Sequence, residues 1–297
     1  MDEKRTHLIE RAAARLGAPI PIREPAPSSS ATIEEFVPTP AVPPNRSPSA
    51  ARTAKQRISA SALAKAGLIS WDEPNNRVSE EFRIIQEKIV RQSFGSNGAV
   101  SGDRKNLVMV TSALEGEGKT FCAINLAGEV ARQGDRKVLL VDADAKPNGL
   151  AQVAGACAGP GLRDLAGSPR LNIESITLPT ETDSLELLPF GMNGEGSAEL
   201  FASRRMADAI EKLGQRFPDR LIIFDAPPCL SSSTPHTLAA VVGQVVLVVA
   251  SGSTQQTDVE AALDLLQACP NIALLLNKVP AWMSHSYGSY GFAAAGA

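Results

Sequence analysis

A ten-residue stretch of the chain combines the residue types that hold a phosphate group. Residues 111–120 read TSALEGEGKT and lie between an apolar run and a helical pattern. Gly116 and Gly118 let backbone N–H groups turn towards a phosphate without a clash from a Cβ atom, and the helix that follows adds its positive end. In such a loop Lys119 neutralises phosphate oxygens and the Thr120 hydroxyl binds Mg²⁺. The expected nucleotide-binding residues are Glu115, Gly116, Glu117, Gly118, Lys119, Thr120 and Phe121.

Three aspartates follow two other apolar runs. Asp142 ends the run at 138–142 and Asp144 follows two residues later, and Asp225 ends the run at 221–225. The carboxyl ends of parallel strands face the ligand crevice of a doubly wound sheet, so we expect these side chains near the loop. Two carboxylates would serve Mg²⁺, which prefers oxygen ligands, and the third would accept a proton from an attacking hydroxyl. The alternative interpretation is that each aspartate caps a following helix.

The elements that must position these residues alternate along the chain. Apolar runs of strand length occur at 107–111, 138–142, 221–225, 245–250 and 272–277. Helical patterns separate them, among others at 120–133, 198–217 and 258–268. The order predicts an α/β fold of the P-loop NTPase type, with a doubly wound, mostly parallel sheet and helices on both faces. Two weaker runs, at 171–176 and 185–188, are expected to extend the sheet.

The composition divides the chain of 297 residues into four regions. Residues 1–16 predict a short helix, and residues 17–57, with nine of the 21 prolines, predict a disordered linker. Residues 58–283 form the P-loop domain, whose part at 58–94 is helical with Ser79 as an N-cap. Residues 284–297 predict a flexible tail, which holds Tyr287 and Tyr290, the two tyrosines of the chain.

Charge and cysteine content exclude several classes of protein. The net charge of −3 argues against a generally basic surface, so nucleic acid is not an expected partner. No apolar run reaches the roughly 20 residues of a membrane helix, and we expect a cytoplasmic protein. The four cysteines are far apart, which favours neither zinc nor disulfides.

Together these motifs resemble those of the bacterial tyrosine kinases (BY-kinases) of capsule and exopolysaccharide synthesis. The similarity covers the phosphate loop, the Asp-x-Asp strand end and the stretch DAPP at 225–228. Other similar stretches are PGLRDL at 160–165, PFG at 189–191 and SAELFAS at 197–203. The stretches LIERA at 8–12 and SEEFR at 79–83 resemble those of the exosortase-associated tyrosine autokinases.

The resemblance implies ATP and Mg²⁺ as cofactors and Tyr287 and Tyr290 as sites of autophosphorylation in trans. It implies that Asp142 is the general base and that Asp144 and Asp225 serve Mg²⁺ beside Thr120. Asn277 would lie near the adenine, and Glu80 and Arg83 would begin a subunit-contact motif. The implied partners are sister chains in a homo-oligomer and a membrane-embedded polysaccharide co-polymerase, or chain-length adaptor, that would hold the chain at the inner membrane.

Three departures from the family pattern keep other functions open. Gln86 replaces the last arginine of the contact motif, which leaves ring assembly uncertain. Residues 145–147 read AKP where the family has an Arg-Pro pair, and the tail has few tyrosines. One alternative is a partition or division-site type P-loop ATPase, although such proteins usually carry a lysine at the position of Leu114. The other is a catalytically weak, ATP-gated regulatory subunit of an export complex.

Overall fold

The structure, a computed structural model, describes residues 57–69, 77–95, 104–144, 146, 149–150, 154–155, 159–168, 170–191 and 197–280. These residues belong to one compact unit, Arg52–Ala297. The predicted helix at 1–16, the linker up to residue 56 and the tail with Tyr287 and Tyr290 lie outside the described residues.

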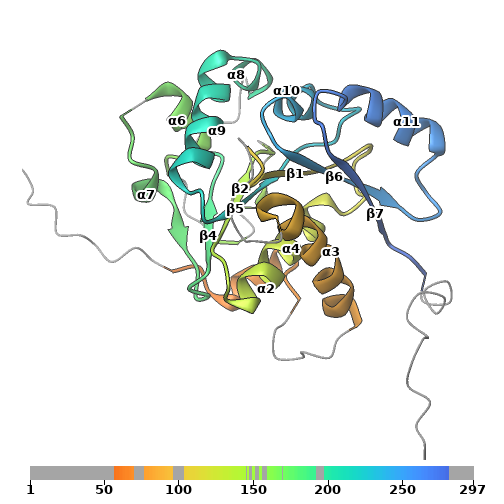
Figure 1. Ribbon diagram of the computed structural model, residues 1–297, viewed down its shortest axis with the longest axis horizontal. Helices are drawn as coiled ribbons and strands as arrows, with labels where there is room; N and C mark the ends of the chain where they lie inside the picture. Colours follow the sequence, from red (N-terminus) through yellow and green to blue (C-terminus); the bar gives the residue numbers. More distant parts are fainter. Residues whose placement is uncertain are drawn as a thin grey trace, which may run out of the picture. The chain divides into compact units, whose positions relative to one another are not determined.

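A seven-stranded sheet forms the centre of this unit (Figure 1), in the order β3-β4-β2-β5-β1-β6-β7. All neighbouring strands pair in parallel except β3 and β4, which are antiparallel. The strands are β1 (Leu107–Ser112), β2 (Val138–Asp142), β3 (Leu178–Pro179), β4 (Leu185–Leu188), β5 (Leu221–Asp225), β6 (Gln244–Ala250) and β7 (Ile272–Asn277). The predicted mostly parallel, doubly wound sheet is confirmed.

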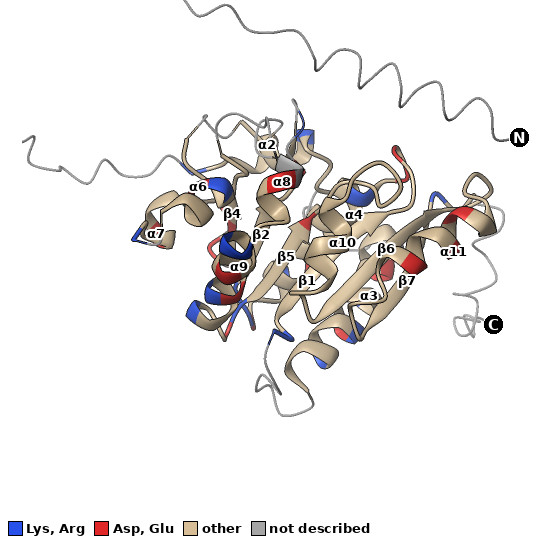
Figure 2. Ribbon diagram, turned by 90° about the horizontal axis from the view of Figure 1, so that it is seen from above, with Lys and Arg blue, Asp and Glu red and all other residues tan. Residues whose placement is uncertain are grey.

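Alternating side chains of the central strands feed two apolar cores, one on each face of the sheet. In β1, Leu107 and Met109 join one core, while Val108 and Val110 join the other. The central strands β1 and β6 carry no charged residues, which gather instead on helices such as α3, α9 and α11 (Figure 2). This pattern explains why both faces of the sheet must be covered by helices.

Two groups of helices cover the two faces. The core that contains Val108 is closed by α2 (Ala60–Lys65), α3 (Arg77–Phe94) and α4 (Lys119–Gln133). The core that contains Leu107 is closed by α6 (Leu162–Gly167), α7 (Ile173–Ile176), α8 (Ser197–Phe201), α9 (Arg204–Arg216), α10 (Thr234–Ala239) and α11 (Gln256–Leu265). Within the described residues, no helix has the length and apolar character needed to cross a bilayer.

The strand predicted at 171–176 is wrong. Residues Ile173–Ile176 form helix α7, because the Asn172 side chain accepts a hydrogen bond from Glu174 N at 3.0 Å and thereby caps a helical turn. The extra strand, β3, begins only at Leu178. The predicted strand at 185–188 is confirmed as β4.

Two helix predictions also need correction. Ser203 accepts a hydrogen bond from Met206 N at 3.3 Å and starts a new helix there, so the single helix predicted at 198–217 is the pair α8 and α9. Helix α3 begins at Arg77, so Ser79 lies in its first turn and is not an N-cap. The N-cap in this region is Ser59, which accepts from Ala62 N at 3.2 Å and starts α2.

The cysteines that the structure describes are buried free thiols: Cys122, Cys229 and Cys269. Cys157 lies outside the described residues.

Candidate active site

The candidate site lies where β1, β2 and β5 end. These three strands are neighbours, with β5 between β1 and β2, and Asp142 pairs in register with Asp225. The phosphate loop leaves the end of β1 and leads directly into α4 at Lys119. The parallel pairing therefore brings together residues that are about a hundred positions apart in the sequence.

Gly116 and Gly118 adopt backbone conformations with positive φ, which glycine tolerates and which the turn of the loop requires. The φ angles of Gly116 and Gly118 are +78° and +95°, a region that side chains strongly disfavour. A Cβ atom on Gly118 would lie 2.1 Å from Asn277 Nδ2. Only glycine fits at position 118 without displacing the neighbouring strand end.

Glu117 anchors the loop from behind. Its side chain is buried and accepts hydrogen bonds from Leu114 N (2.6 Å) and Ala250 N (3.3 Å), and also from the hydroxyl of Thr254. The sequence placed Glu117 among the nucleotide-binding residues but gave no sign of this anchoring. Locally, the sequence shows only a glutamate between two loop glycines. The distant hydrogen-bond partners of Glu117 are Ala250 of β6 and Thr254 in the turn after this strand.

The end of β7 provides a second anchor. Asn277 Nδ2 donates to Glu117 O at 2.8 Å, and Lys278 Nζ donates to Gly116 O at 2.6 Å. Asn277 is thus placed against the phosphate loop, and its predicted contact with adenine stays a prediction.

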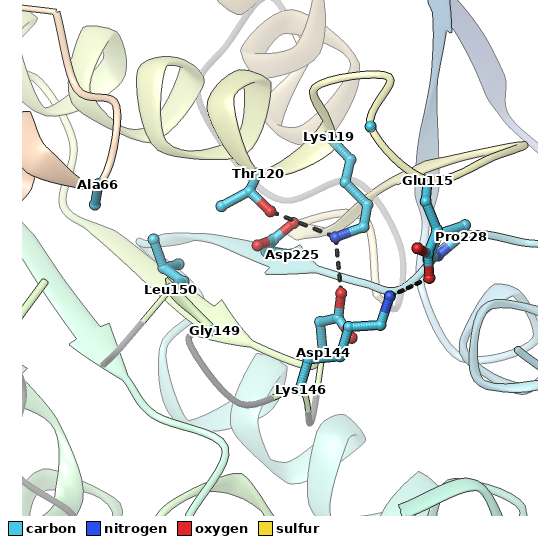
Figure 3. Close-up of a pocket in the computed structure, with 11 residues that line it drawn as sticks. Ala66, Glu115, Lys119, Thr120, Asp144, Lys146, Gly149, Leu150, Asp225 and Pro228 are labelled. Atoms are coloured by element: carbon cyan, nitrogen blue, oxygen red, sulfur yellow. Dashed lines mark hydrogen bonds and ion pairs between the residues drawn. The ribbon is translucent and has the colours of Figure 1, made fainter. Parts of the chain in front are cut away.

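Lys119 meets the predicted carboxylates inside the site (Figure 3). Its Nζ atom lies 2.8 Å from Asp144 Oδ2 and 3.4 Å from Thr120 Oγ1. Burial lowers the pKa of the Lys119 ammonium, but the negative charges of Asp225 and Asp144 outweigh this effect and raise the pKa above its usual value. Lys119 is therefore a firmly charged ammonium group held by an acidic neighbour.

Asp225 is the most deeply buried acid of the site, with 1% of its surface exposed. Burial raises the pKa of its carboxyl to about 6, although the charge of Lys119 and a hydrogen bond from Thr120 act in the opposite direction. Its Oδ1 atom is buried and has no hydrogen-bond partner among the described residues. Such an orphaned acceptor is costly and indicates a partner that arrives with the ligand.

Asp142 lies beside the loop that follows β2. Its Oδ1 atom accepts a hydrogen bond from Asp144 N at 3.2 Å, and a Cβ atom on Gly149 would lie 3.0 Å from its Oδ2 atom. Strand β2 ends at Asp142, so the strand geometry that would aim Asp142 and Asp144 to the same side does not persist. Asp144 lines the cavity beside Lys119 and Asp142 does not, although the negative charge of Asp142 also raises the pKa of Lys119.

Lys119, Asp144 and Asp225 line a cavity of about 280 Å³. Lys146 and Glu115 form an exposed ion pair at this cavity (Figure 3). The lining residues are Ala66, Glu115, Gly116, Lys119, Thr120, Asp144, Lys146, Gly149, Leu150, Asp225 and Pro228. In the described part of the chain, no cluster of three or more His, Cys, Asp or Glu side chains could hold a metal by itself. A cation here would need further oxygen ligands, such as those of a nucleotide phosphate.

Known proteins share both the sequence and the fold of this region. A family model described as "AAA domain" matches residues 106–277. The chain is 30% identical over 226 residues to tyrosine-protein kinase YwqD of Bacillus subtilis. The aligned region covers 75% of this chain and 91% of YwqD. The chain belongs to the bacterial tyrosine kinases. This BY-kinase is also 33% identical to the putative tyrosine-protein kinase EpsB of Ralstonia nicotianae, over half of this chain but only 19% of EpsB.

Solved structures agree with this assignment. The kinase domain of the Escherichia coli tyrosine kinase ETK superimposes with a TM-score of 0.61 at 25% identity, over 76% of this BY-kinase and 86% of that domain. The chimerical protein CapA2B2 gives 0.60 at 25% identity, over 77% and 96% of the two chains. The relatives are tyrosine kinases, which does not favour the partition-type ATPase.

The predicted subunit-contact residues lie on α3, apart from this cavity. Glu80 and Arg83 are exposed and form an ion pair of 2.5 Å with each other. Gln86, which replaces the last arginine of the motif, is buried with 4% exposure. The exposed part of the motif is thus limited to its first two members.

Proposed function

We propose that this BY-kinase uses ATP and Mg²⁺ to phosphorylate Tyr287 and Tyr290 of a sister chain, and that this reaction regulates exopolysaccharide synthesis and export. The observation that carries the proposal is the cluster of Lys119 and carboxylates beside the phosphate loop, with one buried carboxylate oxygen left without a partner. Buried carboxylate oxygens are normally hydrogen-bonded, so this oxygen fits a partner that a ligand would supply.

The residues present fit a magnesium ion that arrives with ATP. Asp225 offers its orphaned Oδ1 atom, and Thr120 and Asp144 add oxygens that line the same cavity. When bound, Mg²⁺ supplies positive charge to the phosphate oxygens. Lys119, now paired with Asp144, would exchange that carboxylate for phosphate oxygens.

The proposed transfer forms one bond and breaks another. The phenolic oxygen of the acceptor tyrosine bonds to the γ-phosphorus, and the bond from that phosphorus to the β–γ bridging oxygen breaks, so ADP leaves. The phenol has a pKa of about 10 and is protonated at neutral pH. Asp142 would accept this proton, while Lys119 balances charge on the transferred group and the loop holds the phosphates in line.

Partners and location follow from the same proposal. Glu80 and Arg83 would contact a neighbouring copy in a homo-oligomer, whose closure into a ring is in question because Gln86 is buried. A membrane-embedded polysaccharide co-polymerase would hold the cytoplasmic chain at the inner membrane. The oligomeric state of wild type and of Arg83→Ala, measured by light scattering, tests the contact between copies. Pull-down of a co-expressed adaptor by wild type tests the membrane partner.

The decisive experiment is incubation with γ-labelled ATP. We expect label on tyrosine in wild type, and none in Lys119→Met or in Tyr287→Phe/Tyr290→Phe. Lys212→Met, which removes an exposed lysine of α9, is the matched control and should label like wild type. Phosphate released to water without protein label would support an ATPase, and binding without turnover would support a regulatory subunit.

A further inference from the structure

Two exposed leucines lie next to the cavity on separate loops. Leu114 is 36% exposed and precedes the lining residue Glu115, and Leu230 is 39% exposed and lies two positions after the lining residue Pro228. Both Glu115 and Pro228 line the cavity, and Figure 3 draws them near each other in that view. Exposed apolar side chains that gather at one place on a surface mark interaction sites.

The two loops are fastened to each other, so this exposure is built into the fold. Cys229 N donates to Ser112 O at 2.8 Å, and Leu230 N donates to Ala113 O at 3.1 Å. Thr111 Oγ1 adds a bond of 2.6 Å to Pro227 O. These bonds continue the pairing of β1 and β5 beyond the strands and hold both leucines at the rim of the site.

The tail that carries the acceptor tyrosines matches an apolar surface and not a charged one. Residues 281–297 read AWMSHSYGSYGFAAAGA and contain no Asp, Glu, Lys or Arg. Ion pairs therefore cannot guide this segment into an acidic site. Its four aromatic residues can bury surface against leucines, and aromatic rings contribute large contact areas in binding.

We propose that Leu114 and Leu230 form an acceptor platform, on which an aromatic side chain of the tail packs while the reacting tyrosine enters the cavity. This inference rests on the proposed kinase function and names the surface that selects its substrate. The platform lies between the phosphate loop and the loop that contains Pro228. It contributes to binding of the acceptor and not to the transfer of phosphate.

The test uses the full chain with Tyr287→Phe/Tyr290→Phe, so that its own tail does not consume ATP. A synthetic peptide of residues 281–297 serves as acceptor. Kinetics are compared for Leu114→Ser, Leu230→Ser and the double variant, each beside its Leu→Met counterpart. Leu265→Ser on α11 is the matched control, because Leu265 is 37% exposed and does not line the cavity.

We expect each serine variant to raise the KM for the peptide about fivefold to tenfold, and the double variant more, since each loses the burial of an aliphatic side chain. For Leu230→Ser, which lies outside the phosphate loop, the kcat at saturating peptide and the Kd for ATP should stay within twofold of the parent. The methionine variants should restore KM. An unchanged KM in the double variant, with the parent active, overturns the platform alone. A parent that never labels the peptide, while wild type never labels itself, overturns the kinase function and the platform with it.

Discussion

Replacing Asp225 with asparagine should stabilise the ligand-free protein while abolishing its activity. The buried carboxylate is nearly isosteric with an amide but carries a charge that its surroundings disfavour. Burial raises the pKa of Asp225 from the ordinary 3.8 to about 6 despite the attraction of Lys119. The folded state therefore holds the proton more tightly than the unfolded state does.

The sign and the size of the effect follow from this difference. Below pH 3.8 the carboxyl is protonated in both states and contributes nothing to the pH dependence. Between about pH 3.8 and 6 only the unfolded state loses its proton, so the free energy of unfolding falls as the pH rises. A shift of about 2 units at about 1.4 kcal/mol per unit gives a cost of about 3 kcal/mol that is fully present above pH 6.

The assay is urea unfolding of Asp225→Asn and wild type in EDTA without nucleotide, at pH 4.5, 6 and 8. At pH 8 the variant should be more stable by about 1–3 kcal/mol, or about 2–10 °C in Tm for a domain of this size, and the gap should shrink towards pH 4.5. Asp219→Asn, an exposed aspartate before β5, should show no gap. The reasoning would be refuted if Asp225→Asn were equally or less stable than wild type at pH 8. It would also be refuted if the difference in their free energies of unfolding did not change with pH. Adding Mg²⁺ and ATP should stabilise wild type and not the variant.

Substitutions at three further positions probe the phosphate loop and its contacts. Gly118→Ala should lower the affinity for ATP at least about tenfold, measured by calorimetry, because its φ of +95° and the 2.1 Å approach to Asn277 Nδ2 force the loop to move. Glu117→Ala should cost about 1–3 kcal/mol in urea unfolding, because Leu114 N and the Thr254 hydroxyl lose their acceptor and Ala250 N keeps only its bond to Thr254 Oγ1. Glu117→Gln, which keeps one acceptor oxygen, should cost less, and equal costs would contradict the anchoring role. Lys146→Ala should leave the unfolding midpoint unchanged, because its ion pair with Glu115 is exposed to water, and a clear drop would show that the pair is structural.

The sequence was sufficient for the sheet because its strands are buried on both faces. Runs such as that of β2 and β5 have no polar face, and their boundaries were predicted correctly to the residue. Prediction failed where short polar side chains decide the local structure. Asn172 turns an apolar run into helix α7, and Ser203 divides a long helical pattern in two, through single hydrogen bonds that periodicity does not detect.

The same division holds for the site. Lys119, Asp144 and Asp225 could be placed together because parallel strands end at one edge of the sheet. The anchoring of the loop by Glu117 could not, since its partners Ala250 and Thr254 are more than 130 positions away in the sequence. Nor does the sequence show which carboxylate is orphaned, because that depends on the depth of each side chain in the folded protein.

Without a ligand, only some of the carboxylate oxygens in the acidic cluster have a hydrogen-bond partner among the described residues. Lys119 has Asp144 as a partner at 2.8 Å, but Asp225 keeps one buried oxygen unpaired and its charge is disfavoured by burial. A cation that approaches with a nucleotide would satisfy that oxygen, and phosphate oxygens would replace Asp144 as partners of Lys119. The free energy that burial of the Asp225 charge costs is then recovered on binding. This links the affinity for the metal–nucleotide complex to the instability that Asp225→Asn should remove.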